Sequence, residues 1–114
     1  VFVLDRREEG PITVLSCNED ITSENFEVFR KQYKAAIADL GNNVRLILNL
    51  TDIERIASAA LGLIAASYPD IVAQGAKMRV VAQSEEILRL LNVTRLSRVI
   101  RVDPDLETAM HSFK

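Results

Sequence analysis

The chain has 114 residues, of which 48% are hydrophobic and 26% are charged, and its formal net charge is −2. This composition excludes a disordered chain, and the length predicts a single domain over residues 1–114 with one core. The slight acidity argues against nucleic acid as a partner, because phosphate binding needs a basic excess. The longest apolar stretch, 56–66, is too short to span a membrane, so we expect no membrane insertion. The start of the chain shows no signal-peptide pattern.

Few residues are available for metal or nucleophilic chemistry. Cys17 is the single cysteine and His111 the single histidine. A lone cysteine cannot form an internal disulfide, which is typical of a protein in the reducing cytoplasm. The sequence contains no clustered zinc ligands and no carboxylate pair at a useful helical spacing in an apolar site. We therefore expect no enzyme activity, no metal and no cofactor.

Strands and helices are predicted to alternate along the chain. Strands at 1–4 and 12–15 should pair antiparallel across a Gly-Pro turn signal. A helix then begins near Thr22 or Ser23, either of which can cap it. Gly41 is placed to end this helix in a left-handed cap. The apolar stripe of the helix recurs every three or four residues and consists of Phe26, Phe29, Tyr33, Ile37 and Leu40.

Three further strands are predicted at 44–50, 77–82 and 99–102. Alternation in the first two indicates that one face of the sheet is much drier than the other. The order of elements gives three consecutive βαβ units, which require parallel strands and right-handed crossovers. If the strand order advances steadily, all crossover helices lie on one face. The predicted fold is therefore α/β, with a mixed, mostly parallel sheet of four to five strands and about four helices.

The remaining helix ends are predicted from capping residues. Ser58 can cap the second helix, and Gly75 closes it. Pro69 lies inside this helix and should kink or break it, because proline removes a backbone hydrogen bond. Ser84 is predicted to cap a third helix and Asp103 to cap the terminal one.

The most informative stretch is 53–64, which follows the strand ending in Asn49 and Leu50 and opens a helix. Within it, residues 57–62 are Ala-Ser-Ala-Ala-Leu-Gly. This resembles the STAS domain of bacterial anti-sigma factor antagonists, in which Asp-Ser-Ser-Gly-Leu-Gly stands at a helix start. The resemblance continues through 75–81 and 87–96, so it covers nearly the whole chain and implies a STAS-like version of the predicted fold.

The departures from the family motif concern its phosphorylated residue. The family carries its phosphate on the second serine, and Ala59 stands at that position. Ala57 replaces the acidic residue and Ala60 the glycine, so Ser58 alone keeps a hydroxyl. The resemblance thus implies a STAS domain without the usual phosphoswitch. Another reading is that Ala57, Ala59 and Ala60 are small only to let the helix lie close to the sheet. Ser58 could be either a helix cap or a phosphorylation site.

The resemblance also implies a function in bacterial signal transduction and transcription regulation. The expected partner is an anti-sigma factor kinase or a related signalling protein. The expected partner-binding residues are Ser58, Ala59, Ala60, Leu61 and Gly62, together with Asp20 and Thr22 in the loop before the first helix. Two alternatives are an accessory subunit or domain of a membrane transport system and a sensor of a small ligand.

Positive charge gathers near the third helix and the last strand, where the sequence places Arg89, Arg95, Arg98 and Arg101. A solvated rim and a partner-docking patch are both compatible with this cluster. The sequence leaves open whether the chain forms a dimer.

Overall fold

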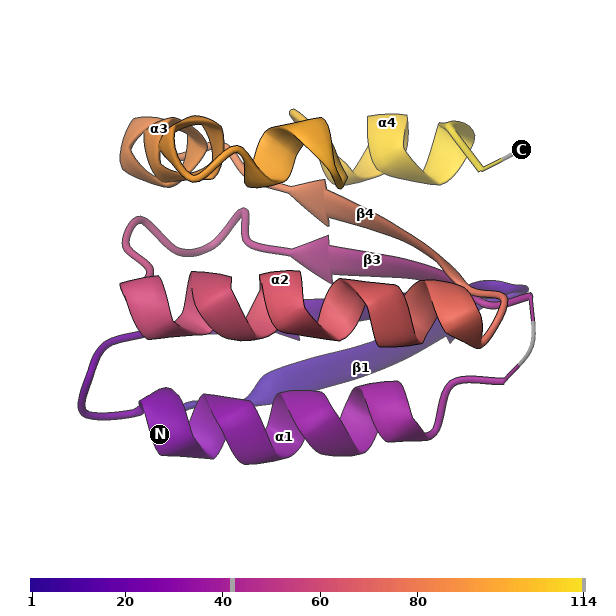
Figure 1. Cartoon of the computed structure of the whole chain (residues 1–114), viewed down its shortest axis with the longest axis horizontal. Coiled ribbons are helices and arrows are strands. Elements are labelled where there is room, and N and C mark those ends of the chain that lie inside the picture. Colours follow the sequence, from indigo (N-terminus) through magenta and orange to yellow (C-terminus); the bar gives the residue numbers. More distant parts are fainter. Residues whose placement is uncertain (42, 114) are drawn as a thin grey trace.

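Five strands and four helices make up the computed structural model, which describes residues 1–41 and 43–113 (Figure 1). The strands are β1 (Leu4–Glu9), β2 (Ile12–Cys17), β3 (Arg45–Asn49), β4 (Lys77–Val81) and β5 (Arg101–Asp103). The helices are α1 (Phe26–Ala38), α2 (Ser58–Ala73), α3 (Glu85–Val93) and α4 (Leu106–His111), and a 3-10 turn, η1, spans Leu96–Arg98. The predicted mixed α/β architecture is confirmed.

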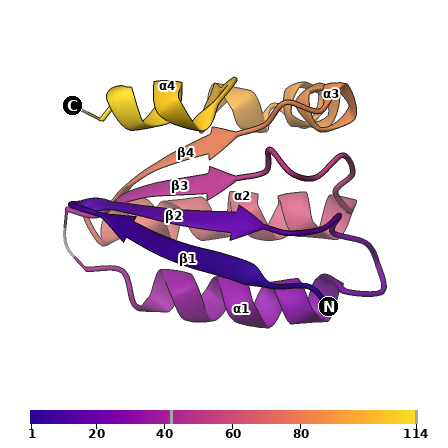
Figure 2. The same ribbon diagram turned by 180° about the vertical axis from the view of Figure 1, so that it is seen from behind.

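The strands lie side by side in chain order, β1-β2-β3-β4-β5. β1 pairs antiparallel with β2, and the other neighbouring pairs are parallel, as Figure 2 shows for the first strands. Gly10 closes the hairpin between β1 and β2 with a φ of 60°, a conformation that glycine adopts without steric cost. The predicted antiparallel start and steady advance of the sheet are both confirmed.

The first strand begins later than predicted, at Leu4 rather than Val1. β1 is an edge strand and its residues from Asp5 to Glu9 are exposed, so no apolar alternation marks it in the sequence. One of the apolar residues that suggested a strand at 1–4, Phe2, is buried instead against Phe29 of α1, with ring centroids 5.8 Å apart. Its role is therefore to pack the N-terminal segment onto α1.

The three crossover helices, α1, α2 and α3, cover one face of the sheet. Their apolar side chains meet those of the strands in the main core, which includes Phe29, Leu48, Ile64 and Ile87. This is the outcome expected when right-handed crossovers connect strands that advance in one direction. The prediction of a single face for these helices is confirmed.

The short terminal helix α4 lies against the opposite face. Its residue Ala109 and the following Phe113 pack on Ile47 of β3 and Val81 of β4. β3 is therefore buried on both faces, and the prediction of one much drier face is wrong for this strand. The sequence pattern misses this because the apolar residues of α4 are few and lie more than fifty residues beyond β3 in the chain.

α2 is unbroken from Ser58 to Ala73 although Pro69 lies inside it, so the predicted break is wrong. Proline has no N–H, so Pro69 leaves the carbonyl of Ala65 without its usual helical hydrogen bond. Both residues are exposed, so water can bind that carbonyl. The N-cap position is the extended residue Ala57, and Ser58 is the first helical residue, so the cap predicted at Ser58 is also wrong. Gly75 follows the helix at a φ of 84°, as its predicted role requires.

The other helix ends follow the predictions only in part. Ser84 caps α3 as predicted, and its Oγ accepts a hydrogen bond from the N–H of Ile87 at 3.3 Å. α1 begins after Asn25, beyond the two predicted cap residues, and Gly41 does not adopt the left-handed conformation predicted for it. α4 is capped by Asp105 instead of Asp103, because β5 continues through Asp103.

Candidate functional site

The start of α2 lies at the carboxyl edge of the parallel strands, where α/β domains usually bind their ligands. Ser58 and Ala59 are exposed there, whereas Ala60 and Leu61 are buried beneath them in the main core. Gly62 is exposed again, and a Cβ built on it would meet no atom within 4 Å. The residues expected from the family motif thus divide into an exposed group, Ser58, Ala59 and Gly62, and a buried pair that holds the helix on the sheet.

The loop before α1 lies directly beside the start of α2. Ile21 forms a parallel bridge with Ile56, and its carbonyl oxygen accepts the N–H of Ala57 at 2.7 Å. Asp20 strengthens this junction, because its Oδ1 accepts the N–H groups of Glu54 at 2.8 Å and Arg55 at 3.2 Å. The structure therefore brings together the two segments that the resemblance singled out separately.

Thr22 shapes this loop from within. Its Oγ1 accepts the N–H groups of Glu24 at 3.2 Å and Asn25 at 3.4 Å. In turn, the side chain of Asn25 accepts a hydrogen bond from the N–H of Thr22 at 2.8 Å and donates one to the carbonyl of Asp20 at 2.8 Å. Asn25 is therefore a site-shaping residue that the sequence analysis missed, since its only signal is a place just before an apolar helix.

A third segment, the start of α3, is tied to the same loop. Ser84 donates from Oγ to the carbonyl of Glu54 at 2.7 Å. Arg55 reaches Glu86 in an ion pair of 3.5 Å, and both side chains are largely exposed. These contacts join residues far apart in the chain, so no local sequence pattern predicts them. Together they fix the loop that leads into α2 from both sides.

The described residues offer little for catalysis at this site. They contain no group of three His, Cys, Asp or Glu side chains that could hold a metal ion. His111 is exposed on α4 beside Glu107, which is on the opposite face of the sheet from α2. Burial raises the pKa of Cys17 to about 12, so its reactive thiolate is strongly disfavoured at neutral pH. What the arrangement provides is a fixed, partly apolar surface.

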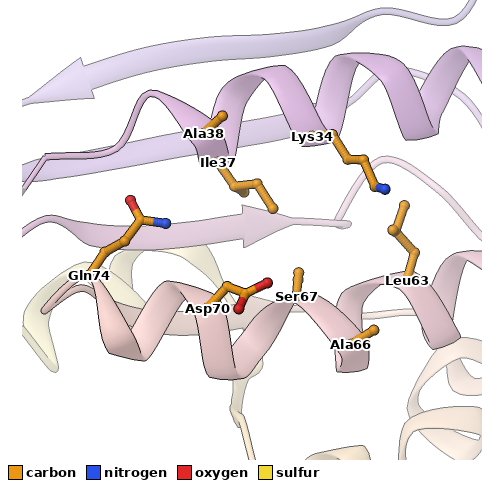
Figure 3. A pocket seen from close by; sticks show the side chains of 8 residues that line it. All are labelled: Lys34, Ile37, Ala38, Leu63, Ala66, Ser67, Asp70 and Gln74. Atoms are coloured by element: carbon orange, nitrogen blue, oxygen red, sulfur yellow. The ribbon is translucent and has the colours of Figure 1, made fainter.

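A hollow of about 420 Å³ lies between α1 and α2, away from the start of α2. Figure 3 shows Lys34 and Ile37 of α1 facing Leu63, Ser67 and Asp70 of α2 across it. Its volume falls in the range of small-molecule pockets, which is roughly 300–1,000 Å³. No local sequence pattern marks these residues as a group, because they come from two helices separated by a strand.

Among the described residues, no helix is long and apolar enough to cross a membrane.

Comparison with known proteins places the chain in a family. A candidate anti-sigma factor antagonist of Thermotoga maritima is 27% identical over 103 residues, which are 90% of each chain. The crystal structure of a candidate anti-sigma factor antagonist from the same organism matches with a TM-score of 0.84 at 25% identity, over 96% of this chain and 93% of that one. An anti-sigma factor antagonist of Mycobacterium paratuberculosis shares the fold, with a TM-score of 0.87 at 20% identity over 99% and 94% of the two chains. The STAS domain family model matches residues 4–109, and the chain belongs to the STAS domain family.

Proposed function

We propose that this protein is a non-catalytic binding module that acts as an anti-sigma factor antagonist in the bacterial cytoplasm. Its partner is an anti-sigma factor kinase or a related signalling protein. The relatives named as anti-sigma factor antagonists support this assignment, since they match nearly the whole chain. Control of sigma factors makes the outcome of binding a change in transcription.

The observation that carries the proposal is the fixed, exposed start of α2. Ser58 and Ala59 are exposed at a helix start, and the loop that leads into it is held by Asp20 on one side and Ser84 on the other. A surface that is already ordered loses little conformational entropy when a partner covers it, which favours affinity. The loop containing Thr22 extends this surface, so the partner contacts both segments at once.

The position of Ala59 sets this module apart from a phosphorylation switch. A phosphate would add about −1.5 to −2 charges to the binding surface and would oppose docking. Ala59 has no hydroxyl to receive one, and it is exposed at the surface where a phosphate would act. We therefore infer that phosphorylation at this position does not regulate binding, so the domain binds its partner constitutively or serves as a scaffold in a larger complex.

The test uses the anti-sigma factors encoded in the genome of the source organism, each purified and titrated against the protein by calorimetry. One of them should bind, release its sigma factor, and bind the Ala59→Asp variant at least tenfold more weakly. The exposed Ala73→Asp at the far end of α2 is the matched control and should bind like the wild type. Binding by none of the anti-sigma factors, or equal binding of both variants, contradicts the proposal.

A second candidate function, sensing of a small ligand, is favoured by the hollow between α1 and α2. The hollow has an apolar wall at Ile37 and Leu63 and opposite charges at Lys34 and Asp70. A ligand seated there should raise the thermal unfolding temperature, and nucleotides and fatty acids are the first compounds to screen. Ala66→Trp, which fills the hollow, should abolish the shift. A docked transport subunit is a third alternative, and co-purification with a permease or transport ATPase would identify it.

A further inference from the structure

The end of α3 and the η1 turn carry a surface that combines positive charge with exposed apolar side chains. We define this α3–η1 surface by its exposed residues, which are Arg89, Val93, Arg95, Arg98 and Val99. Val93 is 72% exposed and Val99 is 57% exposed. Single exposed valines are ordinary on protein surfaces, but here two of them lie among three arginines within eleven residues of chain.

The positive charge of this surface is not balanced locally. Residues 87–102 contain four arginines and no acidic residue, in a chain whose net charge is −2. Arg101 pairs with Asp103 at 3.0 Å, but the other three arginines form no ion pair with the residues that the structure describes. Glu86, the nearest acid in the preceding turn, pairs with Arg55. Three guanidinium groups are thus available to an external partner.

The backbone at Arg95 is held in an unusual conformation. Arg95 has a φ of 64°, which glycine or asparagine adopts with less strain than arginine. Hydrogen bonds on either side fix the turn: Thr94 donates to the carbonyl of Leu90 at 2.7 Å, and Ser97 donates to Asn92 at 2.7 Å. Backbone strain of this kind clusters at functional sites, which supports a binding role for the Arg95 side chain.

The end of α3 lies beside the start of α2. A hollow of about 210 Å³ lies between them and is lined by Ser58 and Gly62 of α2 and by Leu90 and Thr94 of the α3 end, among others. It is open above Gly62, where a side chain would meet nothing. Leu90 and Thr94 are the chain neighbours of Arg89 and Arg95, so a partner that covers the start of α2 and this hollow comes close to these arginines.

We propose that the α3–η1 surface and this hollow bind an acidic, amphipathic helical segment of the partner protein. Carboxylates of the segment pair with Arg89, Arg95 and Arg98, since a guanidinium group offers two parallel hydrogen bonds to a carboxylate. An apolar side chain between them enters the hollow, and the rest of the segment covers Val93 and Val99. The inference rests on the proposed function, because it supplies the chemistry of the partner at the same site.

Other occupants fit this surface less well. Single-stranded nucleic acid is bound on aromatic platforms, and the α3–η1 surface has none. A membrane-surface helix inserts large residues such as Trp, Phe or Leu, whereas this surface offers two valines. A carboxylate-bearing protein segment needs only what is present, namely unpaired arginines close to a small, mainly apolar hollow.

The probe is a synthetic amphipathic peptide of about 18 residues, long enough to form a helix, with a narrow stripe of leucines flanked on both sides by glutamates. A matched peptide carries lysine in place of glutamate. Titration into the isotope-labelled protein, followed by NMR, should shift the amides of Gly62 and of residues 89–99 with the glutamate peptide only. Binding should weaken between about 50 and 300 mM salt, because exposed charges are screened.

Two variants of equal charge test the assignment to these residues. Arg89→Gln/Arg95→Asn/Arg98→Gln should weaken binding of the glutamate peptide at least tenfold; asparagine is used at 95 because it tolerates a positive φ. Arg7→Gln/Lys31→Gln/Lys77→Gln removes the same charge from exposed positions elsewhere and should bind like the wild type. If the first variant does not fold, Arg89→Gln/Arg98→Gln leaves the turn untouched and should still weaken binding severalfold.

Equal weakening in both triple variants, or peptide-induced shifts outside the named residues, would overturn the proposal. So would binding of phosphatidylglycerol vesicles or duplex DNA, but not of the peptide, through residues 89–99. Titration of the natural anti-sigma factor distinguishes failure of the acidic segment from failure of the proposed function. If Ala59→Asp weakens that complex and the arginine variant does not, only the acidic segment is refuted; if Ala59→Asp has no effect, the proposed function itself fails.

Discussion

The hydroxyl of Tyr33 lies 2.7 Å from Oγ of Ser67, in a buried hydrogen bond that joins α1 to α2. Ser67 donates its own proton to the carbonyl of Ile64 at 2.8 Å, so Tyr33 is the donor toward Ser67. Ser67 also lines the hollow between the two helices (Figure 3). The pair therefore sets the separation of α1 and α2 and, with it, the shape of that hollow.

The direction of these hydrogen bonds predicts unequal costs for the two partners. Ser67→Ala leaves the buried Tyr33 donor without an acceptor and should lower the free energy of unfolding by about 2 kcal/mol. Tyr33→Phe removes only a donor to Ser67, which keeps its bond to Ile64, and should cost about 1 kcal/mol. Urea denaturation measures both. The double variant should cost less than the sum of the two, and simple additivity would contradict the coupling.

Alkaline pH should destabilise the fold. Burial raises the pKa of Tyr33 to about 12 from its ordinary 10, and burial raises the pKa of Cys17 to about 12 from 9. Because the unfolded chain loses these protons first, stability is intact below pH 9 and falls between pH 9 and 12. The slope should reach roughly 1.4 kcal/mol per pH unit for each group. Tyr33→Phe should flatten the loss above pH 10; an unchanged slope would contradict the assignment.

Asp20 should contribute to both the stability of the fold and partner binding. Asp20→Ala removes the acceptor for the N–H groups of Glu54 and Arg55, and should lower the free energy of unfolding by about 1–2 kcal/mol. Binding of the anti-sigma factor should fall about tenfold, because the loop beside α2 is no longer held. Asp20→Asn keeps Oδ1 and is the control. Calorimetric titration of both variants with the anti-sigma factor provides the measurement. Equal affinities of Asp20→Ala and Asp20→Asn would show that this loop does not contribute to partner binding.

Ala59 should decide whether the domain can be phosphorylated. Incubated with a cognate anti-sigma kinase and ATP, the wild type should gain no phosphate, whereas Ala59→Ser should gain one at the restored hydroxyl. Intact mass spectrometry detects the difference. Stoichiometric labelling of the wild type at Ser58 would refute the prediction.

The Ala59→Asp variant should change the free energy of unfolding by no more than about 0.5 kcal/mol, since residue 59 is exposed.

Local sequence signals predicted the elements better than their ends. The stripe of α1 and the βαβ order are strong periodic signals, and both led to the correct fold. The predictions that Gly41 ends α1 and that Asp103 caps α4 are wrong, because a residue suited to capping does not cap when the helix or strand ends at another residue. Pro69 misled because an exposed carbonyl can be hydrated, so the cost of proline inside α2 is smaller than in a buried helix.

The candidate site was predictable only as far as its family motif. That motif placed Ser58 and Ala59 correctly at an exposed helix start, but it could not separate them from the buried Ala60 and Leu61. The contact between Ser84 and Glu54 spans thirty residues of chain and depends on how β3 and β4 lie together. Such long-range contacts follow from the assembled sheet and have no counterpart in local sequence patterns.

A sheet whose spatial order repeats its chain order can be built from one end. Each strand of this protein pairs with the strand made just before it, so the hairpin of β1 and β2 offers a template as soon as it leaves the ribosome. Every following helix and strand adds to the newest edge, and no strand has to be inserted between two that are already paired. Synthesis and folding can thus advance together, with only the most recent strand open to wrong pairing, until β5 and α4 complete the domain.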